Sequence, residues 1–137
     1  MNIIGFNFTK ISIEKIKDKA ESPKIKTDIS ILEIKKAKPG ILKTKEEILE
    51  AEFSYDVDYE PGYAKVGFAG RVFLSVEPKV AKEVLKQWKE KKMPEDFKFL
   101  LFNIILRKST LKALNLEDEL NLPLHLPLPS LKKRKEE

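Results

Sequence analysis

Residues 51–76, AEFSYDVDYEPGYAKVGFAGRVFLSV, decide how this chain folds. In the first half of this stretch, apolar and mostly acidic side chains alternate, which is typical of a β-strand with one buried and one solvated face. Pro61 and Gly62 then favour a tight, type II-like turn, because proline presets its φ and glycine accepts a positive one. In the second half, alternate positions are again apolar. The pattern predicts an antiparallel hairpin over 48–76.

Two further strands are predicted before this hairpin. Residues 3–16 alternate in one phase as far as Phe8 and in the other phase from Ile11, as a β-bulge produces. Residues 27–37 change phase midway in the same manner. Strands that change face in this way suggest a sheet that is curved or wetted on neither side. Residues 38–40, Lys-Pro-Gly, are predicted to form the turn that ends this part of the chain.

Two helices are predicted after the hairpin. Pro78 suits a first helical turn, and apolar residues from Val80 to Trp88 recur with helical spacing. A second helix is expected over 95–109, with acids in its first turn and bases at its end, plus at most two further turns. Strands followed by helices indicate an α+β fold, a four-stranded antiparallel sheet with two C-terminal helices on one face.

The last third of the chain carries an unusual amount of apolar surface. Residues 97–106, FKFLLFNIIL, are apolar on almost every side, so this helix must be covered on several sides or shared with a partner chain. Leucines then alternate with other residues, and prolines between them exclude helix or central strand, which favours an extended passage close to polyproline II. The residues of this passage are Leu120, Leu122, Pro123, Leu124, Leu126, Pro127, Leu128 and Pro129.

Composition restricts the classes of protein to which the chain can belong. Its 137 residues suit a single domain, expected over 1–131, followed by a disordered charged tail over 132–137. The absence of cysteine excludes disulfides and thiolate chemistry, and the single histidine excludes a histidine metal cluster. The longest apolar run is well short of the roughly 20 residues of a membrane span, and no signal peptide is evident. We expect a cytoplasmic protein without membrane insertion.

The sequence offers few candidates for catalysis. His125 lies between two leucines, and no partner for it is evident nearby in the sequence. Gly67 and Gly70 lack the spacing and the lysine of a phosphate loop, so they are expected to permit twist or close packing instead. Seven acids and no base lie between residues 46 and 60. They could supply paired carboxylates, or they could simply form the solvated face of a strand. We expect no enzyme, no cofactor and no metal site.

The order of these features resembles a known family, the SecB protein-export chaperones. The resemblance covers the architecture over residues 3–131 and is carried by two motifs. In FAGRVFLSVEP, residues 68–78, the matching positions are Gly70, Val72, Phe73 and Val76, where a strand runs into the first helix. In LNLPLHLPLPSL, residues 120–131, the chain resembles the Leu/Pro passage that follows the long helix of the family.

The resemblance implies an ATP-independent holdase that binds unfolded polypeptides in hydrophobic grooves, in connection with protein export. It also implies a homotetramer built as a dimer of dimers, and an acidic sheet surface that docks a partner. The residues expected to bind polypeptides are Trp88, Phe99, Phe102, Leu122, Leu124, Leu126 and Leu128. The acidic face expected to dock a partner comprises Glu52, Asp56, Asp58 and Glu60.

Two alternatives stay open at this point. A nucleic-acid-binding module is suggested by the net charge of +5 and the lysine-rich first third, although the positive charge is spread along several elements and the best-defined solvated face is acidic. A dedicated interaction subunit, or a chaperone for one client, has the same sequence features as a general holdase.

Overall fold

The computed structural model describes residues 1–18, 22–37 and 45–131. The turn predicted at 38–40 and the tail predicted at 132–137 lie outside the described residues. The elements follow in the order β1 (Asn2–Lys15), β2 (Lys24–Lys36), β3 (Glu47–Glu60), β4 (Ala64–Val76), α1 (Pro78–Trp88) and α2 (Glu95–Glu119). The predicted α+β architecture is confirmed.

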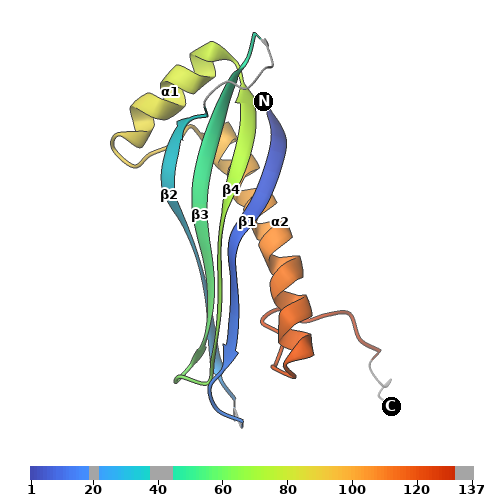
Figure 1. Ribbon diagram of the computed structural model, residues 1–137. Helices are drawn as coiled ribbons and strands as arrows, with labels where there is room; N and C mark the ends of the chain where they lie inside the picture. The colour runs from blue at the N-terminus through green and yellow to red at the C-terminus, as the bar shows by residue number, and fades with distance from the viewer. Residues whose placement is uncertain (19–21, 38–44, 132–137) are drawn as a thin grey trace, which may run out of the picture.

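The four strands form one antiparallel sheet in the spatial order β1-β4-β3-β2 (Figure 1). The predicted hairpin, β3 and β4, therefore lies at the centre of the sheet. Gly62 has a positive φ, +67°, as predicted, but the turn is not of type II, because the Tyr63 N–H donates to the Tyr59 carbonyl at 2.8 Å instead of to the Glu60 carbonyl. The strands predicted before the hairpin are the two edges, because each pairs with only one neighbour.

Bulges in the edge strands explain why their apolar pattern changes phase. In β2 the register shifts between Ile31 and Glu33, so Leu32 is left out of the pairing and is exposed, while Ile34 is buried opposite Ala51. In β1 the register shifts between Phe8 and Lys10, as predicted, and also between Ile3 and Gly5. The extra residue keeps the apolar positions on both sides of a bulge on one face. The suggestion of a sheet wetted on neither side was wrong.

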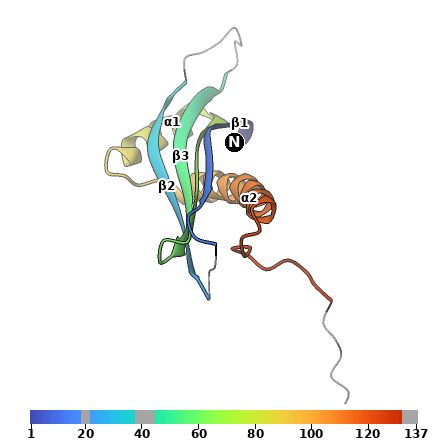
Figure 2. The same ribbon diagram turned by 60° about the horizontal axis from the view of Figure 1, so that its bottom comes forward.

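One face of the sheet carries the core. The buried side chains of β3 and β4 alternate in step across the hairpin, from Leu49 opposite Leu74 to Tyr59 opposite Ala64. Figures 1 and 2 show α2 crossing the sheet behind these strands. Buried residues of both helices belong to the same cluster as this face, among them Val84 of α1 and Leu101 of α2.

Helix α2 is longer than predicted, since it continues without interruption to Glu119, past the one or two further turns expected after residue 109. The reason is that its buried positions recur at every fourth residue over its whole length: Phe97, Leu101, Ile105, Ser109, Ala113 and Glu117. Four residues turn slightly more than one helical turn, so this row moves around the helix by about 40° at each step. The buried row includes a serine and a glutamate, and it therefore could not be recognised as a continuing apolar stripe.

Candidate functional site

The first half of α2 presents apolar side chains to solvent on the side away from the sheet. Phe99 is 58% exposed and Leu106 is 42% exposed, while Phe102 between them is half-buried. Their spacing of three and four residues places them on one side of the helix, which we call the outer face of α2. Exposed apolar patches of this kind mark interaction surfaces when they are contiguous.

The Leu/Pro passage begins by turning back against the core. Asn121 has a positive φ, +55°, and the Leu122 N–H donates to the Glu117 carbonyl at 2.8 Å, which closes the end of α2. Leu122 is only 7% exposed and is part of the core. The Tyr59 hydroxyl donates a hydrogen bond to the Pro123 carbonyl. The passage up to this point is therefore fixed to both the helix and the sheet.

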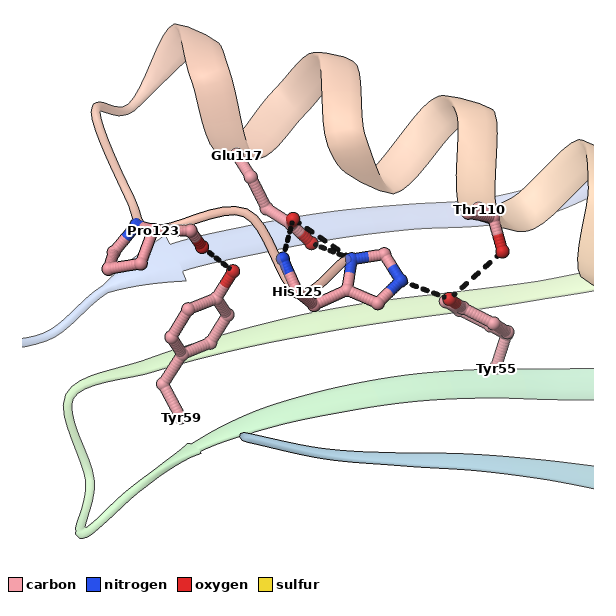
Figure 3. Close-up of polar contacts among 6 residues, drawn as sticks. All are labelled: Tyr55, Tyr59, Thr110, Glu117, Pro123 and His125. Atoms are coloured by element: carbon pink, nitrogen blue, oxygen red, sulfur yellow. Dashed lines mark hydrogen bonds and ion pairs between the residues drawn. The ribbon is translucent and has the colours of Figure 1, made fainter. Parts of the chain in front are cut away.

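A buried polar network holds the next part of the passage (Figure 3). Glu117 and His125 have almost no exposed side-chain surface, and Glu117 accepts hydrogen bonds from the His125 N–H at 2.9 Å and from Nδ1 at 2.8 Å. On its other side, His125 Nε2 lies 2.8 Å from the Tyr55 hydroxyl, which is also 3.5 Å from Thr110 Oγ1. A carboxylate only accepts, so Nδ1 carries a hydrogen. In the neutral ring, Nε2 then accepts the Tyr55 hydrogen.

Both tyrosines of this region resist ionisation. Burial raises the pKa of Tyr55 and Tyr59, and the charge of Glu117 raises both further, while the hydrogen bond with Thr110 lowers the pKa of Tyr55 in part. Each hydroxyl therefore keeps the hydrogen that it donates to the passage. This network was not predicted from the sequence, because the partners of His125 lie 8 and 70 residues away from it.

Beyond His125 the chain leaves the body of the protein. Leu126 and Leu128 are 47% and 57% exposed, and Leu131 is fully exposed. Figures 1 and 2 show this segment extending away from the sheet beside the C-terminal half of α2. We call residues 126–131 the arm. The network at His125 thus separates a fixed portion of the passage from an unpacked one.

The structure divides the seven residues predicted to bind polypeptides among four places. Phe99 and Phe102 lie on the outer face of α2, whereas Leu126 and Leu128 lie on the arm. Trp88 is half-buried at the end of α1, with the Lys91 ammonium 4.4 Å from its ring centroid. The remaining two belong to the anchored part of the passage, Leu122 buried and Leu124 half-buried.

The predicted acidic face lies on the opposite side of the sheet and is mixed in charge. Arg71 on β4 lies 3.4 Å from Glu50 and 3.6 Å from Glu52, and Lys26 on β2 lies 3.5 Å from Glu60. Neighbouring strands thus bring bases beside the acids that follow one another in the sequence of β3. This reduces the negative potential expected from the sequence.

Asp56 is the exception on this face, because its cross-strand neighbour in β2 is Asp28. Burial raises the pKa of Asp56, and the charges of Asp58 and Asp28 raise it further, while Lys10 lowers it. Well below the ordinary pKa of an aspartate, the carboxyl is protonated in both the folded and the unfolded chain, so the raised pKa costs no stability there. The free energy of unfolding falls as the pH rises through the folded-state pKa, because the folded chain must then carry the unfavourable charge.

We expect Asp56→Asn to stabilise the protein by about 0.5 kcal/mol at neutral pH, since like charges opposite each other on a sheet are unfavourable. The gain should disappear near about pH 3, where the carboxyl is protonated. Urea unfolding at both pH values measures it. Asp58→Asn is the matched control, because Asp58 faces Lys26 and Lys65 and should lose stability or stay neutral. A gain for Asp58→Asn equal to that for Asp56→Asn would contradict the argument.

Within the described residues, no helix is long and apolar enough to cross a membrane. The same residues contain no group of three or more histidines, cysteines and acids that could hold a metal ion.

Comparison with known proteins identifies no family for this chain. No protein-family model matches the sequence, and no curated protein is similar to it. Among solved structures, the chain is similar to a SecB-like chaperone of Mycobacterium tuberculosis, solved in complex with a ChAD peptide from the HigA1 antitoxin. The TM-score is 0.49 and the sequence identity is 13%, over 98% of this chain and 92% of that one. This likeness concerns the course of the backbone.

Proposed function

We propose that this protein is an ATP-independent chaperone that holds non-native polypeptides on apolar surface. The observation that carries the proposal is the exposure of Phe99 and Leu106 on the side of α2 that faces away from the sheet. A chain that packs its core this well has no packing reason to leave aromatic and aliphatic side chains in water. Burial of such side chains against an unfolded chain is favourable by about 25 cal/mol per Å².

The proposal extends to the arm and to the setting of the protein. Leu126 and Leu128 on extended, proline-containing backbone present side chains that a bound segment can cover. We further propose that the protein is a cytoplasmic homo-oligomer without enzymatic activity. A role in export would use the face of the sheet opposite the core, where Glu52 and Glu60 lie, to dock a partner. The ion pairs on that face favour a partner of mixed charge over a strongly basic one.

The test is binding of a permanently unfolded probe, reduced and carboxymethylated lactalbumin. Calorimetry measures the affinity of the protein for this probe, and light scattering measures whether the protein suppresses aggregation of the probe. The double variant Phe99→Ser/Leu106→Ser should weaken binding by about tenfold or more, because two exposed apolar contacts are lost. Leu32→Ser is the matched control, since Leu32 is equally exposed but lies on the bulge of β2. Probe binding that is absent in the native protein, or unchanged in the double variant, would refute the proposal.

A second candidate is binding to nucleic acid, and one arrangement favours it. Lys79, Lys82, Lys86 and Lys89 are all exposed and recur at three- and four-residue spacing along α1. None of the four forms an ion pair with another described residue. Tight binding of single-stranded RNA that falls steeply with salt, in a protein that ignores the unfolded probe, would favour this candidate over the first.

A further inference from the structure

The polar side chains that hold the Leu/Pro passage bind its backbone as well as its side chains. The Tyr59 hydroxyl donates to the Pro123 carbonyl, and Glu117 accepts a hydrogen bond from the His125 N–H at 2.9 Å. Any extended polypeptide offers a carbonyl and, two residues later, an N–H, so these two contacts do not depend on the sequence of the bound segment. The three side chains that contact the passage, Tyr55, Tyr59 and Glu117, are called the anchor site below.

Two side chains of the passage add selectivity to this backbone recognition. Leu122 is part of the core and is only 7% exposed. The His125 ring lies between two polar groups, with Nδ1 2.8 Å from the Glu117 carboxylate and Nε2 2.8 Å from the Tyr55 hydroxyl (Figure 3). A purely apolar side chain at this position would leave both groups without a partner. The anchor site therefore favours a segment with an apolar residue and, three positions later, a side chain with an N–H donor.

The anchor site lies on elements that are held in place by other contacts. Its two tyrosines are on β3, which pairs with a strand on each side, and Glu117 is on α2, whose buried row begins at Phe97. The passage contributes nothing to this framework, since none of residues 122–131 belongs to a helix or a strand. The occupant of the anchor site is thus a short extended segment, residues 122–125, lying against a framework built from other parts of the chain.

Withdrawal of this segment would leave a surface that another extended chain can cover. The rings of Tyr55 and Tyr59, now almost fully buried, would become partly exposed, and an apolar gap would remain where Leu122 lies. The Glu117 carboxylate loses its bonds to His125 in this state, but it gains access to water in exchange. A mainly apolar surface with a few placed polar groups is typical of ligand sites.

We propose that the anchor site binds extended segments of non-native polypeptides, and that residues 122–125 occupy it in place of such a segment when none is bound. The chain's own segment defines the chemistry of the occupant, an apolar residue followed three positions later by an N–H donor, as in Leu-Pro-Leu-His. Release begins at the exposed residues beyond His125. The identity of the occupant rests on the proposed function, whereas the exchange of the passage does not.

The exchange is tested with a fluorescent peptide of residues 120–131, LNLPLHLPLPSL, and two full-length variants that both loosen the passage. His125→Ala weakens the attachment of the passage and keeps the anchor site, so it should bind the peptide. Glu117→Ala frees the passage but lacks the acceptor, and it should bind the peptide at least about tenfold more weakly. Fluorescence anisotropy measures both affinities. Equal affinities, or no binding to His125→Ala, would overturn the proposal.

The native protein gives a second measurement that needs no variant. Excess unlabelled peptide should displace the passage of isotope-labelled protein, so the His125 backbone N–H should exchange with solvent faster, as nuclear magnetic resonance measures. The affinity should be about tenfold or more below that of His125→Ala, because the chain's own segment must leave first. The same peptide with alanine in place of its histidine is the control and should have little effect. An exchange rate that stays constant at every peptide concentration would overturn the proposal.

Competition with the unfolded lactalbumin probe assigns the occupant. His125→Ala should bind the probe about tenfold more tightly than the native protein does, because its anchor site is open, and the peptide should reverse this gain. A native dimer that dissociates when the peptide is added would assign the anchor site to the passage of a second copy and overturn the client as its occupant.

The same measurements separate this inference from the proposed function. Probe binding that is lost in Phe99→Ser/Leu106→Ser, but is unaffected by the peptide and by His125→Ala, would overturn the inference and leave the proposed function standing. Peptide binding by His125→Ala, in a protein that binds no probe in any form, would refute the proposed function and the client as occupant, while the exchange of the passage would stand.

Discussion

Replacing Glu117 by alanine is expected to lower the free energy of unfolding by about 3 kcal/mol, because removal of one member of a buried hydrogen-bonded pair leaves the polar groups of the other member unsatisfied. Glu117 has no exposed surface and accepts hydrogen bonds from both the backbone N–H and Nδ1 of His125. The variant would leave two buried donors without an acceptor, together with a cavity. Urea unfolding followed by circular dichroism measures the change.

Two comparisons make this prediction specific. Glu119→Ala removes a solvent-exposed carboxylate from the same end of α2, and its effect should stay within about 0.5 kcal/mol. A double-mutant cycle of Glu117→Ala with His125→Ala should show an interaction energy of at least about 1 kcal/mol, because the two side chains act as a unit. If Glu117→Ala and Glu119→Ala were equally mild, the network would not be what fixes the passage.

The same variant should change the protection of the passage. Leu122 packs in the core, and among the residues described up to Leu131, His125 is the last that is hydrogen-bonded to the body. When the Glu117 side chain is lost, the chain from about Leu124 onward is expected to detach, since Leu122 keeps its place in the core and the Pro123 carbonyl keeps its hydrogen bond from Tyr59. Limited proteolysis should then cleave near Leu124 in Glu117→Ala faster than in the native protein, while cleavage within the sheet is unchanged.

Replacing Gly70 by alanine is the second change for which a large effect is expected. A Cβ built on Gly70 would lie 2.5 Å from the Asn7 carbonyl oxygen and 2.7 Å from two ring atoms of Phe53. The first of these is backbone of the paired strand β1, so it cannot move without disturbing the pairing. Overpacking of this kind costs about 1–3 kcal/mol, and we expect a value at the upper end, about 3 kcal/mol.

Gly67→Ala is the matched control, since both glycines lie in β4. The nearest atom to a Cβ on Gly67 is Oδ1 of Asp56, at 3.3 Å, and this carboxylate can turn toward solvent. The change should be within about 0.5 kcal/mol, and a small gain is expected from the restricted unfolded chain. Thermal or urea unfolding compares the two. Equal destabilisation by both substitutions would mean that loss of strand glycine, and not contact with Asn7 and Phe53, is responsible.

The packing role of Gly70 was predicted from the sequence, but its neighbours are known only from the structure. The sequence places it in a strand without a phosphate-loop pattern, which predicts a role in close packing. In the structure, Phe8 and Phe53 are its partners on the two neighbouring strands, and the ring of Phe53 lies over the missing side chain. The identity of those neighbours follows from the strand order β1-β4-β3-β2, which the spacing of apolar residues does not contain.

Local periodicity was sufficient to predict the elements. Alternation over 48–76 predicted the central hairpin, and Pro78 predicted the start of α1, because both signals arise from neighbouring residues on one element. It was insufficient for the end of α2. There the buried row includes Ser109 and Glu117, whose burial depends on partners brought by other elements.

The sequence by itself determined the sheet, the helices that follow it and the excess of apolar surface in the last third, since each of these depends on which side chains recur at a given period. Only the tertiary structure decided which of those side chains are covered. Leu122 is buried and Leu128 is exposed, although they lie in the same Leu/Pro passage. The difference arises because His125, between them, meets Glu117 and Tyr55 from two other elements, and contacts between distant segments exist only after the chain has folded.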